Sequence, residues 1–292
     1  MGPFDPRVTP ARPDLAAKEL YGKVAAERYV EGSVYEVIAP QTPLRGEPRP
    51  DAPLSTEALR GERVMVFEIN AEGWAWGQLA ADGYVGWLAA SALTPPELPP
   101  THRVAALRTF VFPGPSIKLP PLEALPFGAR LTIAETNDQM AVTPARGYVP
   151  AVHLAPIARY ERDFVAVAEH FVGAPYLWGG KTILGLDCSG LLQVALKACG
   201  IACPRDSDMQ EDALGTPIAL AAALADPQRG DLIFWKGHVA IVCDRTNVIH
   251  ANAFHMAVAI EPIAEAVERI RTGGAEISSI RRLPPNRLPP NP

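Results

Sequence analysis

Pro-Tyr-Leu-Trp-Gly-Gly-Lys-Thr-Ile-Leu-Gly-Leu-Asp-Cys-Ser-Gly, residues 175–190, places Cys188 between a glycine-rich loop and an apolar helical pattern. Four apolar residues recur on one face of that helix: Leu192, Ala195, Leu196 and Cys199. Gly200 then supplies the end of the helix. A helix N-terminus presents unpaired N–H groups and partial positive charge, which favour a thiolate. The sequence therefore predicts that Cys188 is a reactive thiol with a lowered pKa.

The alternative for Cys188 is a small buried hydrophobe, which is the usual role of an unpaired cysteine. Asp187, Ser189 and Gly190 are poor neighbours for a dry core position. The polar surroundings favour the reactive thiol.

Two histidines downstream complete the parts that a thiol hydrolase needs. His238 opens one short apolar run and His250 closes the next, with turn residues at 244–247 between them. This pattern predicts a β-hairpin. A loop of about three or five residues would set both imidazoles on one face, whereas a two-residue loop would set them on opposite faces. Cys188, His238 and His250 can then act as nucleophile, base and orienting group, an order typical of papain-like enzymes.

Residues 158 to about 283 resemble the NlpC-type papain-like endopeptidases, which cleave bacterial cell-wall peptides. The resemblance rests on six motifs in order: Pro-Tyr-Leu-Trp-Gly-Gly (175–180), Asp-Cys-Ser-Gly (187–190), Pro-Arg-Asp-Ser (204–207) with Gln210, Gly-Asp-Leu-Ile-Phe-Trp (230–235), His-Val-Ala-Ile (238–241) and Ile-His-Ala (249–251). It implies an α+β fold in which helices pack on an antiparallel sheet.

The resemblance also implies an activity, the hydrolysis of an amide formed by the γ-carboxyl of D-glutamate with meso-diaminopimelate or L-lysine. It makes Cys188 the nucleophile, His238 the base and His250 the orienting residue. Tyr176 aligns with a tyrosine near the thiol, where its hydroxyl would help the Cys188 N–H stabilise the oxyanion. The alternative for Tyr176 is an aromatic wall of the cleft.

Five further residues are candidates for substrate recognition: Asp187, Ser189, Arg205, Asp206 and Ser207. Ser189 and Ser207 could donate hydrogen bonds to the free α-carboxylate of the D-glutamyl residue. Asp187 could hold a substrate ammonium, or it could cap the helix that follows. Asp206 and Ser207 could likewise form only a helix cap, with Arg205 as an ion-pair partner.

The N-terminal half predicts two small β modules. Residues 31–94 resemble a bacterial SH3-like domain, especially at Gly73-Trp74 and Gly83-Tyr84-Val85-Gly86-Trp87. Residues 101–157 resemble a degenerate second copy, since Gly128-Ala-Arg-Leu-Thr-Ile aligns with Gly61-Glu-Arg-Val-Met-Val, and a Pro-rich linker separates the two. Residues 1–30 are predicted to form a helical segment, and residues 158–292 the peptidase domain.

In family members with this domain order, an SH3-like domain restricts the cleft to peptides with a free N-terminal L-Ala. By that resemblance Tyr84 contacts the substrate amine, and Glu47 is a second, acidic candidate. The alternative for Tyr84 is an aromatic residue of the barrel core.

Composition narrows the function further. The net charge of −5 argues against a nucleic-acid partner, and 48% apolar residues over 292 positions suffice for two or three packed domains. No stretch reaches the ~18 apolar residues of a membrane span, and the first residues lack the apolar region of a signal peptide, so we expect a cytoplasmic protein. Cys199, Cys203 and Cys243 show no metal-ligand pattern, and we expect no metal or cofactor. Residues 283–292 are predicted to be an extended tail.

These features together predict a cysteine peptidase that releases L-Ala-γ-D-Glu from free murein peptides during cell-wall peptide recycling. One alternative is a secreted endopeptidase that acts on the intact wall. The other is a catalytically inactive module that binds wall peptides through its barrels.

Overall fold

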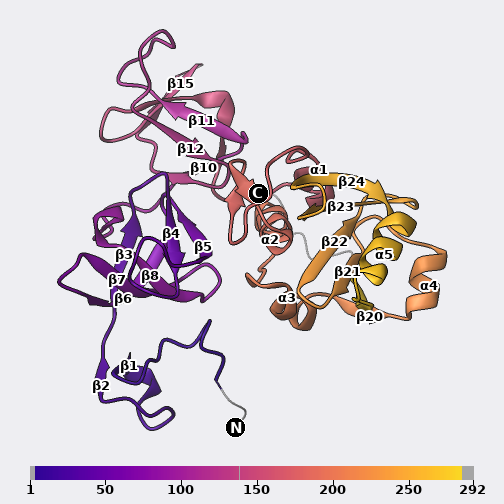
Figure 1. Ribbon diagram of the computed structural model, residues 1–292. Helices are drawn as coiled ribbons and strands as arrows, with labels where there is room; N and C mark the ends of the chain where they lie inside the picture. Colours follow the sequence, from indigo (N-terminus) through magenta and orange to yellow (C-terminus); the bar gives the residue numbers. More distant parts are fainter. Residues whose placement is uncertain (1–3, 138, 285–292) are drawn as a thin grey trace. The chain divides into compact units, whose positions relative to one another are not determined.

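The chain divides into two compact units that meet in sequence between Ile157 and Ala158. The computed structural model describes residues 4–137 and 139–284 (Figure 1). The predicted tail lies outside the described residues from position 285 onward. In the part of the chain that is described, no helix is long and apolar enough to cross a membrane.

The first module of the N-terminal unit is a seven-stranded antiparallel sheet in the order β5-β4-β8-β7-β6-β3-β9. Its elements are β3 (Ser33–Val37), β4 (Gln41–Arg45), β5 (Leu54–Leu59), β6 (Arg63–Ile69), β7 (Trp74–Leu79), β8 (Val85–Ala89), the 3₁₀ turn η2 (Ala90–Ala92) and β9 (Leu93–Thr94). Side chains alternate along the strands, so Val64 and Val66 of β6 point into a core that Val37, Leu44 and Leu88 share. This is the module that the strand-like runs of residues 31–94 predict.

The second module has a separate core of Val104, Val111, Leu125, Ala129, Leu131 and Val149. Its elements are β10 (His102–Val104), β11 (Arg108–Val111), β12 (Glu123–Pro126), β13 (Arg130–Leu131), β14 (Glu135–Thr136), β15 (Met140–Val142), β16 (Tyr148–Pro150), η3 (Ala151–His153) and β17 (Leu154–Pro156). The aligned Gly61 and Gly128 adopt the same left-handed backbone, with φ of +77° and +83°. In both modules a 3₁₀ turn and a strand follow the aligned Gly-Tyr-Val motif. These shared features support the internal repeat.

The prediction of a helical segment in residues 1–30 is wrong. Its described residues form β1 (Leu15–Ala17), the 3₁₀ turn η1 (Lys18–Leu20) and β2 (Arg28–Val30), and β1 pairs with β2 in parallel. All three residues of β1 are fully buried, which one face of a surface helix cannot achieve. Leu15 and Ala17 pack against aromatic residues of the first module, which outweighs the helical spacing of the apolar residues: Phe67, Trp76 and Trp87.

The C-terminal unit is built on a six-stranded sheet in the order β20-β25-β21-β22-β23-β24, and every pair in it is antiparallel. The strands are β20 (Thr216–Ile218), β21 (Leu232–Trp235), β22 (His238–Val242), β23 (Asn247–Asn252), β24 (Ala257–Pro262) and β25 (Ile277–Arg282), and a separate pair is β18 (Lys181–Thr182) with β19 (Gly185–Leu186). The helices are α1 (Phe164–Glu169), α2 (Cys188–Ala198), α3 (Ser207–Ala213), α4 (Leu220–Ala225) and α5 (Ile263–Thr272). The structure confirms the predicted α+β class.

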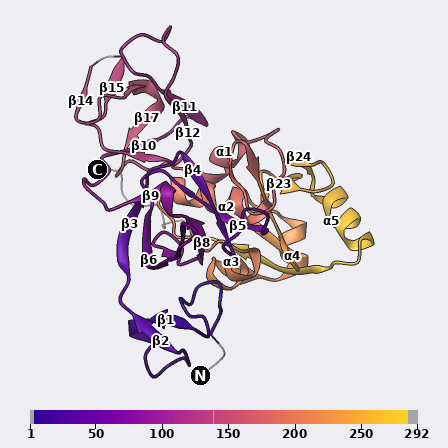
Figure 2. The same cartoon turned by 60° about the vertical axis from the view of Figure 1, so that its left-hand side comes forward.

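Helices cover the sheet around its central strands. Helices α4 and α5 share a core with alternate residues of the strands, among them Ala240, Val242 and Val248. Helix α2 packs against β22 and β23 (Figure 1), and α5 lies beside β23 and β24 (Figure 2). Since Cys188 begins α2, this packing brings the predicted nucleophile to the two strands that carry the histidines.

The burial of Leu15 predicts how strongly the N-terminal segment stabilises its unit. Leu15→Ala should lower the free energy of unfolding by about 3 kcal/mol, because it removes a fully buried side chain and leaves a cavity. Val34→Ala, at a position 45% exposed on β3, should change it by less than about 0.5 kcal/mol. Chemical denaturation followed by tryptophan fluorescence measures both. Equal effects would show that the segment adds nothing to the core.

Candidate active site

Cys188 is placed by the cap of α2. The Asp187 carboxylate accepts a hydrogen bond from the Gly190 N–H at 2.6 Å, which closes the first turn, and another from the Gly179 N–H of the glycine-rich loop at 2.7 Å. The loop lies close to the helix, because a Cβ on Gly190 would stand 2.3 Å from the Gly180 carbonyl oxygen. The predicted helix after Cys188 is confirmed, and its start is fixed to the loop before it.

A buried ion pair holds the same carboxylate from the other side. The Arg205 guanidinium contacts both Asp187 oxygens, at 2.9 and 2.8 Å, and its side chain is 1% exposed. Arg205 also donates to the Ser189 hydroxyl at 2.8 Å. These three side chains hydrogen-bond to one another, and the structure supports the capping role of Asp187. Contacts of Asp187, Ser189 and Arg205 with substrate stay a prediction. Arg205 is an ion-pair partner, but of Asp187.

Asp206 and Ser207 lie where the chain enters α3. Asp206 occupies the cap position of that helix, yet its side chain makes no capping hydrogen bond. Ser207 is the first helical residue and is 8% exposed. The alternative of a pure helix cap is therefore not supported for Asp206, and contacts of both residues with substrate stay a prediction.

The two histidines share one face of the hairpin β22–β23. In the register Ile241 opposes Ile249 and Val242 opposes Val248, so the five residues 243–247 separate the last pair. This odd number confirms the expectation from the sequence, because His238 and His250 then point to the same side. His238 Nε2 lies 2.8 Å from His250 Nδ1.

The sulfur of Cys188 lies near the histidine pair, at the point where β22 and β23 are no longer paired. The ladder between β22 and β23 covers Ile241 and Val242 only, so the start of β22 is not paired with β23. The Val239 N–H there donates a hydrogen bond to the Cys188 sulfur. Because His238 directly precedes Val239, the fold brings Cys188, His238 and His250 into one site.

Burial disfavours the charged forms of both Cys188 and His238. It raises the pKa of the Cys188 thiol to about 12, and the Asp187 charge adds to this shift, while the N–H groups of Val239 and Ser189 oppose it. Burial likewise lowers the pKa of His238 to about 3, with the nearby His250 and Arg269 acting in the same direction. The expected lowering of the thiol pKa by the helix N-terminus is thus outweighed, and thiol and imidazole are both neutral at pH 7.

Tyr176 shares the electrostatic environment of Cys188. Burial, the Cys188 charge and the Asp187 charge together raise the pKa of its phenol to about 12. The Tyr176 hydroxyl therefore stays protonated at neutral pH and can donate a hydrogen bond. Both the oxyanion role and the role of an aromatic wall remain compatible with this position.

The sequence reasoning missed two charged residues behind the histidines. Glu261 of β24 accepts a hydrogen bond from His250, whose Nε2 lies 2.6 Å from the Glu261 Oε1, and Arg269 of α5 forms an ion pair with the same oxygen. The signal was a glutamate inside the apolar run Ala257–Pro262, and pairing with Val248 turns it toward the face that carries His250.

The two candidates in the N-terminal unit have different surroundings. Tyr84 is 7% exposed and belongs to the core of the first module, which favours its structural role. Glu47 lies on the surface, 2.8 Å from Arg49. Its contact with a substrate amine stays a prediction.

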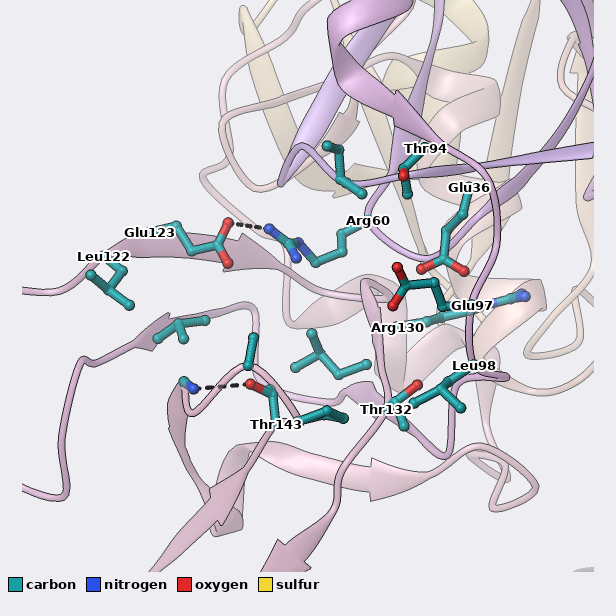
Figure 3. A pocket seen from close by; sticks show the side chains of 16 residues that line it. Glu36, Arg60, Thr94, Glu97, Leu98, Leu122, Glu123, Arg130, Thr132 and Thr143 are labelled. Carbon is teal, nitrogen blue, oxygen red and sulfur yellow. Dashed lines mark hydrogen bonds and ion pairs between the residues drawn. The ribbon is translucent and has the colours of Figure 1, made fainter.

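A hollow of about 450 Å³ in the N-terminal unit is lined by both modules (Figure 3). Two of its carboxylates form ion pairs: Glu123 with Arg60 at 2.6 Å, and Glu36 with Arg63 at 2.9 Å. It holds none of the residues that the sequence proposes for catalysis. Within residues 4–137 and 139–284, no group of three or more His, Cys, Asp or Glu side chains is arranged to hold a metal.

Comparisons with known proteins show which families the two units resemble. Residues 173–274 match the NlpC/P60 family, and residues 44–93 match the bacterial dipeptidyl-peptidase Sh3 domain. Dipeptidyl-peptidase 6 of Lysinibacillus sphaericus is 30% identical over 239 residues, which cover 74% of this chain and 86% of that protein. The gamma-D-glutamyl-L-lysine dipeptidyl-peptidase of Bacillus subtilis is 28% identical over 263 residues, 80% of this chain and 82% of that protein.

A solved structure shows the same fold over most of the chain. The crystal structure of an NlpC/P60 family protein from Bacillus cereus superposes with a TM-score of 0.70 at 23% identity, covering 88% of this chain and all of that one. The fold, and a thiol beside a histidine pair, define a papain-like cysteine peptidase. The chain belongs to the NlpC/P60 family of cysteine peptidases, with a bacterial SH3 domain before the catalytic domain.

The raised pKa of Cys188 predicts the pH dependence of its alkylation. Below a pKa of about 12, the fraction of Cys188 present as thiolate rises tenfold with each pH unit. The rate of its reaction with iodoacetamide should therefore rise about tenfold per unit from pH 6 to 9. The Cys188→Ser variant gives the background from the other three cysteines, which are buried. A high rate that is constant from pH 5 to 8 would instead reveal a resting thiolate–imidazolium pair.

The buried ion pair predicts a large loss of stability on removal of its cation. Arg205→Gln should lower the free energy of unfolding by about 3–5 kcal/mol, because it leaves the Asp187 carboxylate buried without its partner. Arg245→Gln breaks an exposed pair with Asp226 and should cost less than about 1 kcal/mol. Denaturation of both variants checks this, and a similar cost for the two would contradict a special role for Arg205.

Proposed function

We propose that this peptidase cleaves the amide between γ-D-glutamate and a diamino acid in short murein peptides with a free N-terminal L-Ala, and releases L-Ala-γ-D-Glu. The observation that carries the proposal is the meeting of Cys188 with the hydrogen-bonded pair of His238 and His250. Two names support the substrate: one relative is a gamma-D-glutamyl-L-lysine dipeptidyl-peptidase, and the Sh3 domain is of the dipeptidyl-peptidase kind. We further propose that the enzyme acts on free peptides rather than on the wall, in cell-wall peptide recycling in the cytoplasm.

The first half of the reaction transfers a proton and forms an acyl-enzyme. Nε2 of His238 is hydrogen-bonded to His250, so Nδ1 is the ring nitrogen available to the thiol. As the sulfur attacks the γ-carbonyl carbon, the thiol proton moves to Nδ1 of His238. Transfer of the proton during the attack suits a site in which neither the Cys188 thiol nor the His238 imidazole is charged at rest.

The tetrahedral intermediate then collapses. The carbon–nitrogen bond breaks, and His238 returns its proton to the leaving amine of the diamino acid. Water attacks the remaining thioester, gives a proton to His238 and releases L-Ala-γ-D-Glu with regeneration of the thiol. The Cys188 N–H and the protonated Tyr176 hydroxyl are the proposed donors to the oxyanion.

Recognition of the substrate is assigned to two residues at the start of α3 and to one residue of the N-terminal unit. Ser207 and Asp206, at the start of α3, are the proposed contacts for the D-glutamyl residue and the peptide amine. Glu47 is the proposed acidic contact in the N-terminal unit. Asp187 and Arg205 also support Cys188 through their buried ion pair.

Product analysis by mass spectrometry tests the proposal. Purified protein should split L-Ala-γ-D-Glu-meso-diaminopimelate or its L-lysine counterpart into L-Ala-γ-D-Glu and the free diamino acid, and leave the N-acetylated peptide intact. Cys188→Ala should abolish turnover, because it removes the nucleophile, while peptide affinity changes by less than about threefold. The corresponding substitution at buried Cys199 should preserve activity.

Three outcomes would contradict parts of this function. Turnover by a clean Cys188→Ala preparation would contradict the role of Cys188 as the nucleophile. Cleavage of the N-acetylated peptide and of insoluble peptidoglycan would favour an endopeptidase that acts on the wall. Failure to cleave any of the peptides would point to another amide substrate.

A further inference from the structure

The imidazole of His250 is fully buried and uses both of its ring nitrogens. Its Nδ1 lies 2.8 Å from His238 Nε2, and its Nε2 lies 2.6 Å from Glu261 Oε1. Its side chain has no exposed surface. A ring in this position cannot exchange partners with water, so the protonation of one nitrogen determines what the other can do.

Glu261 decides which nitrogen of His250 carries the proton. Burial would raise the pKa of Glu261, but the hydrogen bond from His250 and the charge of Arg269 outweigh it and hold that pKa below its usual value. An ionised carboxylate only accepts hydrogen bonds, so His250 must donate from Nε2. In the neutral ring Nδ1 is then an acceptor.

The same logic extends to the proposed base. Because His250 Nδ1 accepts, the hydrogen bond at 2.8 Å must be donated by His238 Nε2. A neutral His238 that is protonated at Nε2 has a free lone pair on Nδ1. Both hydrogen bonds are therefore donated in the same direction, from His238 to His250 and from His250 to Glu261. Nδ1 of His238 carries no proton and can accept the one from the Cys188 thiol.

Helix α5 holds the carboxylate at the end of this chain. Arg269 forms an ion pair with Glu261 Oε1, and its guanidinium lies 4.4 Å from the centre of the Phe254 ring. His255 also faces this carboxylate, with Nδ1 at 4.0 Å from Oε1. Glu261 is thus fixed between a strand residue, His250, and a helix residue, Arg269.

We propose that Glu261 is a positioning residue for the peptidase: through His250 it fixes the proton of His238 on Nε2 and so leaves Nδ1 free for the Cys188 thiol. Arg269 keeps the Glu261 carboxylate in place. The inference rests on the proposed roles of Cys188, His238 and His250, but not on which peptide bond is cut.

The isosteric variant Glu261→Gln separates charge from shape. A carboxamide has one acceptor oxygen and adds an N–H donor, so it no longer excludes donation to His250 Nε2. With that donor at Nε2, the His250 proton moves to Nδ1 and the hydrogen bond to His238 is reversed. The base would then carry its proton on the wrong nitrogen. We expect kcat to fall about 100-fold or more with KM unchanged within about threefold, because Glu261 acts through the histidines and not on the substrate.

Nitrogen-15 NMR of protein labelled in its histidine rings reads the proton positions without any substrate. We expect Nε2-protonated rings for His238 and His250 in the native protein and a shift toward Nδ1 protonation in Glu261→Gln. The variants His238→Gln and His250→Gln assign the signals. The rate of Cys188 alkylation should fall in Glu261→Gln as well, so the inference can be judged even if the proposed peptides are not cleaved.

Two variants guard against a purely structural explanation. Glu261→Asp keeps an acceptor-only carboxylate, so it should preserve the native ring-proton pattern and lose less than about tenfold in kcat. Glu265→Gln removes an exposed carboxylate from the first turn of α5 and should leave activity and ring protons unchanged. The inference is overturned if folded Glu261→Gln keeps the native proton pattern and kcat, or if Glu261→Asp disturbs the pattern as much as Glu261→Gln.

Discussion

The buried carboxylate of Asp187 is the point on which the catalytic unit depends. It accepts hydrogen bonds from Gly179, Gly190 and the Arg205 guanidinium, and it is almost fully withdrawn from water. A buried charge is costly unless it is paired and hydrogen-bonded, so these partners hold one another in a single arrangement. They come from three segments: the glycine-rich loop, the first turn of α2 and the chain before α3. The position of Cys188 follows from all three.

The support that positions the thiol does not ionise it. The Asp187 charge and burial both raise the pKa of Cys188, and the two N–H groups at its sulfur do not compensate. A thiol held by a carboxylate needs a base of its own to become a nucleophile. The site therefore separates two tasks: Asp187 and Arg205 fix where the sulfur lies, and the histidines remove its proton.

The Cys188 thiol and the two histidines lie together where the pairing between β22 and β23 stops. Helix α2 packs against these strands and brings the thiol, while the histidines share their face with core residues beneath α4 and α5. The start of β22 pairs with β21 but not with β23, which lets the Val239 N–H reach the sulfur and leaves His238 beside it. A continuous ladder would have used that N–H within the sheet. The missing pairing between β22 and β23 thus makes the Val239 N–H available to the catalytic sulfur.

The α+β class came from the family resemblance, and the structure decided the odd length of the loop that sets His238 and His250 on one face. The local pattern of the sequence by itself determined the helix after Cys188 and the hairpin that carries the two histidines. These features follow from the period of a helix or a strand, which depends on near neighbours only. The strands of the first module followed from the same alternation. The N-terminal segment did not, because aromatic residues of the first module bury three consecutive residues there and override the helical spacing.

Only the tertiary structure decided which alternatives apply at the candidate site. It paired Asp187 with Arg205 in a buried support of Cys188, and it placed Glu261 and Arg269 behind His250. Arg205 lies 18 residues from Asp187, and Glu261 lies 11 from His250, so no helix or strand period links either pair. Which charges become partners is set by burial, since a side chain that loses water must find its hydrogen bonds among whatever the fold brings near.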